Sequence, residues 1–416
     1  MHRRHFLKTS ATASLLPLVG TTALAQTTQS KNPKVKELRD RIKPITKEER
    51  EQRIEKARKL MTDQNMDALI LEGGMSLYYF TGVQWGRSER LFAMMLPKDG
   101  DPFFIAPKFE EGRALEQVAP MNRGKLYTWE EHESPYLLIK KMLFDMNLLS
   151  SIVGVEETVR YFVTDELSQQ CPGLNFVSGT PITAGCRSVK SKDEINLMQI
   201  ANDITAEVFT SAVKSLDEGM TQRDFSSLIS DGFKEFGVGG GALVLFGEAS
   251  AYPHGTVKEY KLKPGDIVLI DGGCSVEGYA SDVTRTTVFG APSEKMERVF
   301  SIVRKAQSAA LAYAKPDVPG ENIDTVARKV ISDAGYGPDY KYFTHRLGHG
   351  IGLEGHEWYY LVRGNKRLEQ AGNMHSNEPG IYIPGEFGIR LEDEMLITPE
   401  GAKLLLPQAE SLVKIF

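Results

Sequence analysis

The sequence predicts a smaller α/β domain followed by a larger α+β domain, and three observations support this organisation. The chain has 416 residues, which is enough for two domains with large buried cores. Strand-like and helix-like segments alternate over residues 47–185, as in an α/β domain. Over residues 186–416 the helices come in pairs and most strands are joined as hairpins, which indicates an α+β domain.

The first 25 residues have the layout of an export signal. Paired arginines in "HRRHFLK" precede a weakly apolar stretch over residues 11–25 that ends in "ALA". This resembles a twin-arginine signal peptide, residues 1–25, and predicts a periplasmic protein. An N-terminal anchor helix is the alternative, but the apolar run is short for a bilayer and contains proline and glycine. Residues 26–46 are polar and mixed in charge, and we expect a linker or extended arm there.

Charge and cysteine content exclude further classes of protein. Cleavage of the signal removes three basic residues and no acid, so the formal net charge moves from −5 to −8. A negative net charge disfavours binding to nucleic acid. Beyond the first 25 residues, no segment of the sequence is a candidate membrane span. Three cysteines do not make a disulfide framework. We expect three buried thiols, although Cys171 and Cys186 could pair in an oxidising compartment.

The expected elements follow from hydrophobic periodicity and turn residues. In the first domain they are helices over 47–64 and near 135–147, and strands over 67–73, 90–107 (two, joined by "KDGD"), 151–156 and 174–179. In the second domain they are helices over 192–216, 221–236, 293–315 and 321–334, then mainly strands over 340–405. "GVGGGA" (237–242) lacks the Lys-Ser/Thr of a phosphate loop, so we expect a turn entering a strand.

Two predicted hairpins each present a pair of acids. In "DIVLIDGGCSVEGYASDVTRTTV", Asp271 and Asp282 are equidistant from a turn near residues 276–278, so an unbulged hairpin would place them opposite each other. In "NEPGIYIPGEFGIRLEDEMLI", Glu378 and Glu392 are related in the same way about Gly385. Two unit charges about 4 Å apart repel by roughly 4 kcal/mol at an effective dielectric near 20. Two such pairs therefore indicate bound cations.

Histidines cluster near these hairpins. "HRLGHGIGLEGHE" (345–357) resembles the H-E-x-x-H helix of zinc proteases in its first spacing, but Arg346 stands where the glutamate should be. Its glycines also disfavour a helix, so we expect extended or turning backbone. His349 with the four carboxylates would make a site for two divalent ions, Mn²⁺ first, with Co²⁺ or Zn²⁺ possible. We expect His132 and His375 to be satisfied core residues.

These residues resemble the pita-bread metallopeptidases, a family that includes methionine aminopeptidase, aminopeptidase P and prolidase (Xaa-Pro dipeptidase). The matching motifs are "YPHG", "LKPGDIVLIDGG", "GYASDVTRT", "THRLGHGIGLEGHE", "NEPGIY" and "GIRLED". "SLYYFTG" (76–82) resembles the N-terminal domain of the prolidase and aminopeptidase P branch, which methionine aminopeptidases lack. The resemblance implies a creatinase-like α/β N-terminal domain and an α+β pita-bread catalytic domain.

The resemblance also implies roles for individual residues. Asp271 would bind one metal ion, Asp282 and Glu392 would bridge both ions, and His349 and Glu378 would bind the other. Glu378 would also accept the proton of the attacking water. His254 and His356 would flank the scissile bond as catalytic groups, and His345 and Arg390 match positions on the leaving-residue side of the site. Arg363, Arg367 and Tyr382 are further candidates for binding substrate.

The implied activity is hydrolysis of the Xaa-Pro bond, with dipeptides preferred, by a homodimer. Dipeptide preference needs a cation for the product-side carboxylate, for which Arg390 with Arg363 or Arg367 are the candidates. The alternatives are an aminopeptidase acting on longer peptides, a metal-dependent non-peptidase, and a ligand-binding protein on the same fold. All five ligand positions are filled, which disfavours a binding protein with a decayed site. Tyr359 departs from the proline that relatives often carry, and this affects the rim of the pocket.

The export signal gives a testable prediction. Replacement of Arg3 and Arg4 by lysine should strongly reduce the amount of protein in the periplasm, because the arginine pair is the recognised feature of the signal. Immunoblots of periplasmic and cytoplasmic fractions measure this, with wild type as the control. Undiminished periplasmic protein in the double variant would contradict the twin-arginine assignment.

Overall fold

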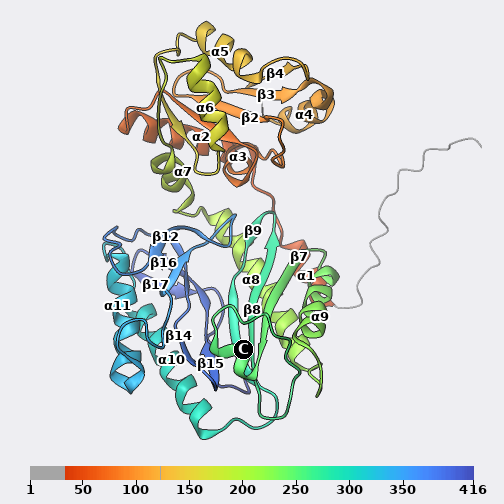
Figure 1. Cartoon of the computed structure of the whole chain (residues 1–416), viewed down its shortest axis with the longest axis vertical. Helices are drawn as coiled ribbons and strands as arrows, with labels where there is room; N and C mark the ends of the chain where they lie inside the picture. Colours follow the sequence, from red (N-terminus) through yellow and green to blue (C-terminus); the bar gives the residue numbers. More distant parts are fainter. Residues whose placement is uncertain (1–32, 122) are drawn as a thin grey trace, which may run out of the picture.

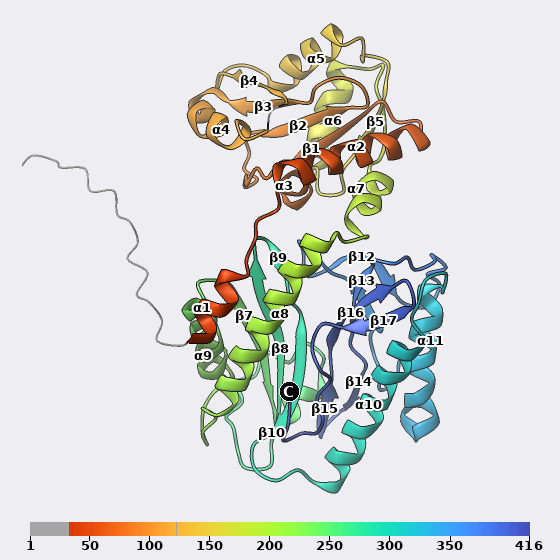
Figure 2. The ribbon, with the colours of Figure 1, turned by 180° about the vertical axis from the view of Figure 1, so that it is seen from behind.

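The computed structural model describes residues 33–121 and 123–416, which form two lobes (Figures 1 and 2). The described part of the chain starts in the second lobe with helix α1 (Pro33–Asp40), crosses to the first lobe before α2, and returns between α7 and α8. The predicted signal peptide lies outside the described residues. Within the described residues, no helix has the length and apolar character needed to cross a membrane.

Helix α1 lies in the range that we expected to be a linker or arm. Its Val35 and Leu38 are three residues apart, so they share one helix face, and both are buried. Figure 2 shows α1 beside α8 of the second lobe, and Arg41 donates to Asp203 on α8 at 2.7 Å. Two apolar residues among many charges are a weak sequence signal, which is why this packing helix resembled a linker.

The first lobe is a six-stranded mixed sheet covered by helices, with strand order β4-β3-β2-β1-β5-β6. Its strands are β1 (Ala68–Glu72), β2 (Ala93–Pro97), β3 (Phe103–Pro107), β4 (Lys125–Trp129), β5 (Ile152–Val155) and β6 (Asn175–Ser178). Its helices are α2 (Lys47–Asp63), α3 (Met75–Thr81), α4 (Glu111–Val118), α5 (Pro135–Asp145), α6 (Tyr161–Gln170) and α7 (Thr180–Arg187). Three strand pairs are parallel, and helices supply their crossovers. The α/β prediction is confirmed.

The second lobe is α+β, as predicted. Helices α8 (Lys192–Val213), α9 (Gln222–Glu235), α10 (Glu294–Tyr313) and α11 (Gly320–Ile331) lie outside its curved sheets (Figure 1). The strands of one sheet are β7 (Gly239–Phe246), β8 (Ile267–Val276), β9 (Tyr279–Ala280) and β10 (Val283–Val288). The others are β11 (Gly348–Gly350), β12 (Glu357–Leu361), β13 (Met374–Asn377), β14 (Gly380–Ile383), β15 (Phe387–Arg390), β16 (Asp393–Thr398) and β17 (Gly401–Leu404). Thr221 caps α9, and residues 239–242 enter β7, both as expected.

The first acidic hairpin has a different register from the predicted one. Asp271 on β8 pairs with Thr284 on β10, so Asp282 lies two residues nearer the turn than expected. The turn residues are Glu277 and Gly278, both with positive φ, which suits a two-residue hairpin turn. The predicted turn was one residue too early. Side chains alternate with a period of two, so Asp271 and Asp282 still project from the same face.

The second acidic hairpin has the predicted register. Strands β14 and β15 pair with Gly380 opposite Arg390. Strands β13 and β16 continue the same register, with Asn377 opposite Asp393. Glu378 and Glu392 fall where the ladder is interrupted between these two pairs. The backbone N–H groups of both glutamates bond elsewhere, to Leu347 and Thr284 respectively. The break in the ladder therefore frees two opposed carboxylates to face the same space.

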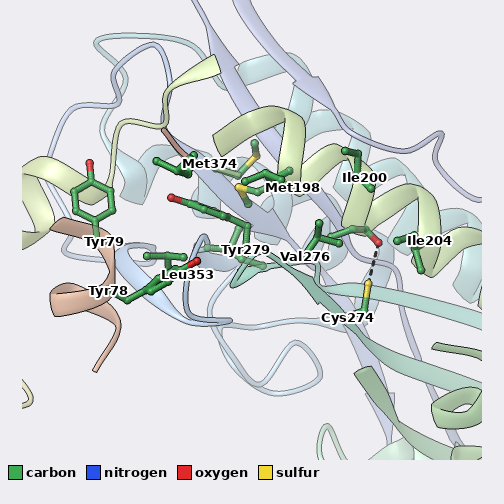
Figure 3. Packing of buried hydrophobic residues seen from close by; sticks show 14 of the residues in the cluster. Tyr78, Tyr79, Met198, Ile200, Ile204, Cys274, Val276, Tyr279, Leu353 and Met374 are labelled. Atoms are coloured by element: carbon green, nitrogen blue, oxygen red, sulfur yellow. Dashed lines mark hydrogen bonds between the residues drawn. The ribbon is translucent and has the colours of Figure 1, made fainter. Parts of the chain in front are cut away.

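The two lobes share part of one hydrophobic core. Figure 3 shows Tyr78 and Tyr79 of α3 packed near Leu353 and Tyr279 of the second lobe. The Tyr78 hydroxyl donates to the Glu277 carbonyl at 3.2 Å, and the Arg53 guanidinium donates to the Tyr279 hydroxyl at 3.0 Å. The tip of the β8–β9 hairpin is thereby held against the first lobe, which couples the position of that lobe to the hairpin that carries two of the acids.

The structure also tests the expectations for the cysteines and for two histidines outside the predicted site. All three cysteines are free and buried, so Cys171 and Cys186 do not pair. His375 is a buried residue that bonds to Glu369 at 2.6 Å, as expected of a core histidine. The expectation for His132 is wrong, because it is exposed in the loop between β4 and α5, where charged neighbours surround it.

Candidate metal centre and active site

A cavity of about 460 Å³ lies in the second lobe among the predicted site residues. It is lined by Pro253, His254, Asp271, Gly272, Asp282, His345, Arg346, His349, His356, Glu378, Arg390 and Glu392. These residues come from the loop before β8, from β8 itself, the segment before β10, the loops around β11, and the two ends of the β14–β15 hairpin. The cavity therefore brings together parts of the chain that are about 140 residues apart, from 253 to 392.

The four predicted carboxylates converge on one wall of this cavity. Oxygen atoms of Asp271, Asp282 and Glu392 lie within 4.8 Å of one another. A second group, His349, Glu378 and Glu392, is equally compact. Glu392 belongs to both groups, so two neighbouring clusters of ligand atoms share one carboxylate. Such an arrangement of oxygen and imidazole donors matches the preferences of hard and borderline divalent cations.

His349 is held with one ring nitrogen toward the carboxylates. Its Nδ1 lies 3.0 Å from the Gly350 carbonyl and therefore carries the proton. Its Nε2 faces Glu378 at 3.4 Å and Asp282 at 3.8 Å. A lone pair on Nε2 is thus directed at the acids, because the hydrogen bond from Nδ1 fixes the tautomer, as in metal-ligating histidines. The expectation that this histidine lies on extended backbone is confirmed, since it is the middle residue of β11.

The glycines beside His349 allow the close approach of neighbouring strands. A Cβ on Gly348 would lie 2.0 Å from the Ser376 carbonyl, and one on Gly350 would lie 2.2 Å from the Trp358 carbonyl. Both distances are far inside van der Waals contact. Larger residues at either position would push β11 away from β13 or β12 and move His349 off the acids.

A hydrogen-bond network orients the carboxylates of Asp271 and Glu392. The Thr284 hydroxyl lies 3.0 Å from Asp271 and 2.6 Å from Glu392. Arg390 donates to Asp271 at 2.5 Å, and it also donates to the hydroxyls of Thr284 and Tyr382. Arg390 lines the cavity as expected, but four of its five N–H groups bond within the protein, so it has a clear structural role beside the acids.

The ionised forms of the clustered acids are disfavoured by burial and by mutual repulsion. Burial, followed by the charges of Asp271 and Glu378, raises the pKa of Asp282 well above its usual range. Burial and neighbouring acids raise the pKa of Glu378 and of Glu392 in the same direction. Arg390 opposes these shifts but supplies only one positive charge for four carboxylates. The donor set fits bound divalent cations, which would supply the missing charge.

Lowered pKa values favour the neutral form of His345, His349 and His356. Burial and the nearby His356 lower the pKa of His349 to about 3, and burial with Arg390 lowers the pKa of His345 to about 3. Burial and then Arg346 lower the pKa of His356 as well. Neutral imidazoles are the form that binds metal or donates a hydrogen bond without adding charge.

His356 stacks on His349 with ring centroids 3.8 Å apart. It also forms a third compact group of possible ligands with Asp282 and His349, so its position would allow a metal contact as well as the expected contact with substrate. Arg346 Nη2 lies 3.3 Å from its Nδ1. A guanidinium can only donate, so Nδ1 is the acceptor and the ring proton of His356 is on Nε2.

His345 belongs to a second polar chain in the cavity. Its Nδ1 lies 2.8 Å from the Arg346 carbonyl, and its Nε2 lies 2.7 Å from the Tyr382 hydroxyl. Tyr382 in turn accepts from Arg390 at 2.8 Å. His345 does line the cavity, whereas Tyr382 lies behind it and orients both neighbours.

The loop that carries His356 is clamped to the junction between the lobes. Glu357 is buried and accepts from Arg187 at 2.5 Å and from Lys190 at 2.9 Å. It also accepts the backbone N–H of Leu353 at 2.9 Å, which closes the loop on itself. Although burial alone would raise it, Lys190 and Arg187 hold the pKa of Glu357 at about 2. The ion pairs thus link the end of α7 to the position of His356.

Two expected substrate residues lie outside the cavity. Arg363 is exposed and donates to Asp339 at 2.6 Å, because the chain leaves the site after β12. Arg367 stacks its guanidinium 3.2 Å from the Tyr359 ring. The residues that sequence reasoning missed are Arg346, considered only as a departure from a zinc motif, and Thr284. The period of two along β10 could have found Thr284, because it shares a face with Asp282.

Comparison with known proteins agrees with this geometry. Residues 196–399 match the model of "Metallopeptidase family M24", and residues 53–189 match the "Creatinase/Prolidase N-terminal domain". An uncharacterized peptidase of Staphylococcus aureus is 35% identical over 354 residues, which are 83% of this chain and 96% of the relative. The chain belongs to metallopeptidase family M24. It has the two-domain pita-bread architecture, and it is a metallopeptidase.

Solved structures of family members are similar to this M24 peptidase over most of its length. A recombinant prolidase from Thermococcus sibiricus has a TM-score of 0.78 and 31% identity, covering 86% of this chain and 96% of its own. The dipeptidase PepE from Mycobacterium ulcerans has a TM-score of 0.82 and 30% identity, covering 88% and 97%. An X-Pro aminopeptidase from Thermotoga maritima has a TM-score of 0.72 and 28% identity, covering 83% and 97%.

Asp282→Asn and His254→Ala should separate metal binding from action on substrate. The Asp282 variant should bind metal at least roughly 10-fold more weakly, because one of the clustered ligand carboxylates loses its charge. The His254 variant should keep its metal and lose roughly 10²–10³ in kcat, as when an oxyanion donor is removed. Elemental analysis and peptide assays measure both. Equal metal content in the two variants would contradict these roles.

Metal stabilisation should grow with pH. The folded-state pKa values of Asp282, Glu378 and Glu392 are raised. The metal-free fold therefore gains stability from these groups at low pH and loses it as pH rises through the raised values. Bound cations remove this loss and must displace protons at low pH. The increase in Tm on adding Mn²⁺ to chelator-treated protein should rise from about pH 5 to pH 8. An increase that is constant or falls with pH would contradict the electrostatic account.

Proposed function

We propose that this M24 peptidase is a dinuclear metal-dependent Xaa-Pro dipeptidase. The observation that carries the proposal is the convergence of four carboxylates and four histidines on one small cavity. Its size falls in the range of small-molecule sites. The similarity to proteins described as a prolidase and a dipeptidase supports the same substrate class.

The Xaa-Pro bond sets particular demands on an enzyme. It is a tertiary amide, so its nitrogen offers no hydrogen for the enzyme to bind. Hydrolysis must therefore rely on activating water, stabilising the developing oxyanion, and protonating the departing nitrogen. A site rich in acids, with imidazoles on its open side, supplies groups for each of these tasks.

The cations would be held by Asp271, Asp282, His349, Glu378 and Glu392. We propose two divalent ions per chain, with Mn²⁺ the first choice and Co²⁺ or Zn²⁺ as alternatives. When bound, such ions polarise the scissile carbonyl and lower the pKa of the attacking water. The remaining work of the reaction falls to the side chains around them.

Glu378 is the proposed general base. It lies at the break in the hairpin ladder, where the Ser376 hydroxyl donates to its Oε1 at 3.2 Å. Its Oε2 faces His345 at 3.7 Å. One oxygen is thus oriented by the protein, and the carboxylate lines the cavity, where it can accept a proton from water and later deliver it to the departing proline nitrogen.

His356 and His254 are the proposed hydrogen-bond donors to the reacting peptide. Arg346 occupies Nδ1 of His356, which leaves Nε2–H free to donate toward the cavity. His254 lines the cavity and is exposed. Donors of this kind stabilise the charge that develops on the carbonyl oxygen during attack. We propose that they contact the two sides of the scissile bond.

A pair of proline peptides tests the proposed function. With Mn²⁺ added, wild-type protein should hydrolyse Ala-Pro faster than Ala-Pro-Ala, and should leave Ala-Ala nearly intact. Rates are measured by amino-acid release. Faster cleavage of the tripeptide would favour the aminopeptidase alternative, which the similarity to the X-Pro aminopeptidase keeps open. Cleavage of none of the three by metal-loaded protein would point to a different reaction on this fold.

A further inference from the structure

A dipeptidase needs a cation near the scissile bond to recognise the free carboxylate of its substrate. Two arginines line the cavity, Arg346 and Arg390. Arg390 is buried, and its nitrogens donate to Asp271, Thr284, Tyr382 and the Pro253 carbonyl. These bonds use four of its five N–H groups, and its charge is paired with Asp271, so little of Arg390 is left to bind a ligand.

Arg346 is differently placed. It is partly exposed, and none of the ion pairs among residues 33–121 and 123–416 involves its guanidinium. Its contacts are with neutral groups: Nη2 lies 3.3 Å from His356 Nδ1, and the guanidinium carbon lies 4.1 Å from the centre of the Tyr360 ring. Contact with the ring restrains the guanidinium, and its remaining N–H groups can bind a carboxylate in bidentate fashion.

Arg346 lies close to the metal-ligand cluster, on the far side of one histidine. The guanidinium contacts His356, and the His356 ring stacks directly on His349 at 3.8 Å. Arg346 is therefore separated from the metal-ligand cluster by a single imidazole. In a Xaa-Pro dipeptide the carboxylate lies one residue beyond the scissile carbonyl, or roughly 3.5 Å along the chain. A longer peptide would place an uncharged amide there.

We propose that Arg346 is the receptor for the C-terminal carboxylate of a Xaa-Pro dipeptide, and so determines the preference for dipeptides. This inference rests on the proposed function. It replaces Arg363 and Arg367 in that role, because both lie outside the cavity. Tyr360 holds the guanidinium in place, and the bond from Arg346 to His356 would couple carboxylate recognition to the orientation of a catalytic histidine.

Comparison of Ala-Pro with its amide, Ala-Pro-NH₂, isolates the contribution of the carboxylate. Wild-type enzyme should prefer the free acid in kcat/KM, and Arg346→Gln should reduce that preference by roughly 10- to 100-fold, as expected for a charge-assisted hydrogen bond. The loss should come mainly from a higher KM for Ala-Pro. Any effect through His356 alters both substrates equally and cancels in the ratio.

Two further variants control the experiment. Arg298→Gln, an exposed arginine on α10 that does not line the cavity, should keep the wild-type ratio. Arg346→Lys keeps the charge without the planar fork and should retain part of the preference, which also covers the case of a poorly folded glutamine variant. Circular dichroism of each variant verifies folding.

The outcomes separate this inference from the function on which it rests. If wild type cleaves Ala-Pro and Arg346→Gln keeps the full preference for the free acid, Arg346 is not the carboxylate receptor, although the dipeptidase assignment stands. Asp-Pro serves as a third substrate, with an acidic residue before proline. If Arg346→Gln loses activity on Asp-Pro only and keeps the preference for Ala-Pro over its amide, the guanidinium faces the residue before proline, and the inference is wrong. If metal-loaded wild type cleaves neither Ala-Pro nor its amide, the proposed function fails and this inference fails with it.

Discussion

Four carboxylates crowd one wall of the catalytic cavity, and the structure around them is arranged to hold them there. Their mutual repulsion and burial raise the pKa values of Asp282, Glu378 and Glu392. One arginine, Arg390, offsets part of this repulsion through its contact with Asp271. The rest must come from protons or cations, and the direction of the pKa shifts means that these two compete. The repulsion between these buried carboxylates therefore favours the binding of cations, which would relieve it.

The fold keeps the acids in place through anchors behind each hairpin. Arg285, the neighbour of Thr284, is fully buried, donates to Asp393 at 2.6 Å, and also bonds to the backbone carbonyls of Glu392 and Ile415. A buried ion pair of this kind fixes position more than it adds stability. It joins β10, β16 and the end of the chain directly beside the ligands. The clamp of Arg187 and Lys190 on Glu357 serves the histidine loop in the same way.

Hydrophobic periodicity and turn residues were sufficient to predict most of the fold. The register of the Glu378–Glu392 hairpin followed from its turn at Gly385, whereas the register of the Asp271–Asp282 hairpin was missed by two residues. That error came from a turn of Glu277 and Gly278 whose positive φ values are not marked by a strong sequence signal. Helix α1 was missed because two buried apolar residues were outnumbered by charges.

The arginines around the cavity are placed by tertiary contacts, so their positions could not be predicted from the spacing of residues in the sequence. Arg346 follows His345 directly in the chain, yet its role depends on Tyr360 and His356, which approach it only when β12 pairs with β11. Arg363 and Arg367 are close in sequence to the same region, but the loop after β12 carries them away from the cavity. Residue type and spacing therefore located the clustered carboxylates, which lie on or beside paired strands, better than the expected substrate residues, which lie on loops.

The count of metal ions bound per chain tests the central claim most directly. Purified protein is stripped with chelator, incubated with Mn²⁺, freed of unbound metal, and measured by elemental analysis against protein concentration. Two clusters of ligand atoms that have Glu392 in common predict about two ions per chain. Protein that is folded and binds none would contradict the view that the buried carboxylates are held together by cations.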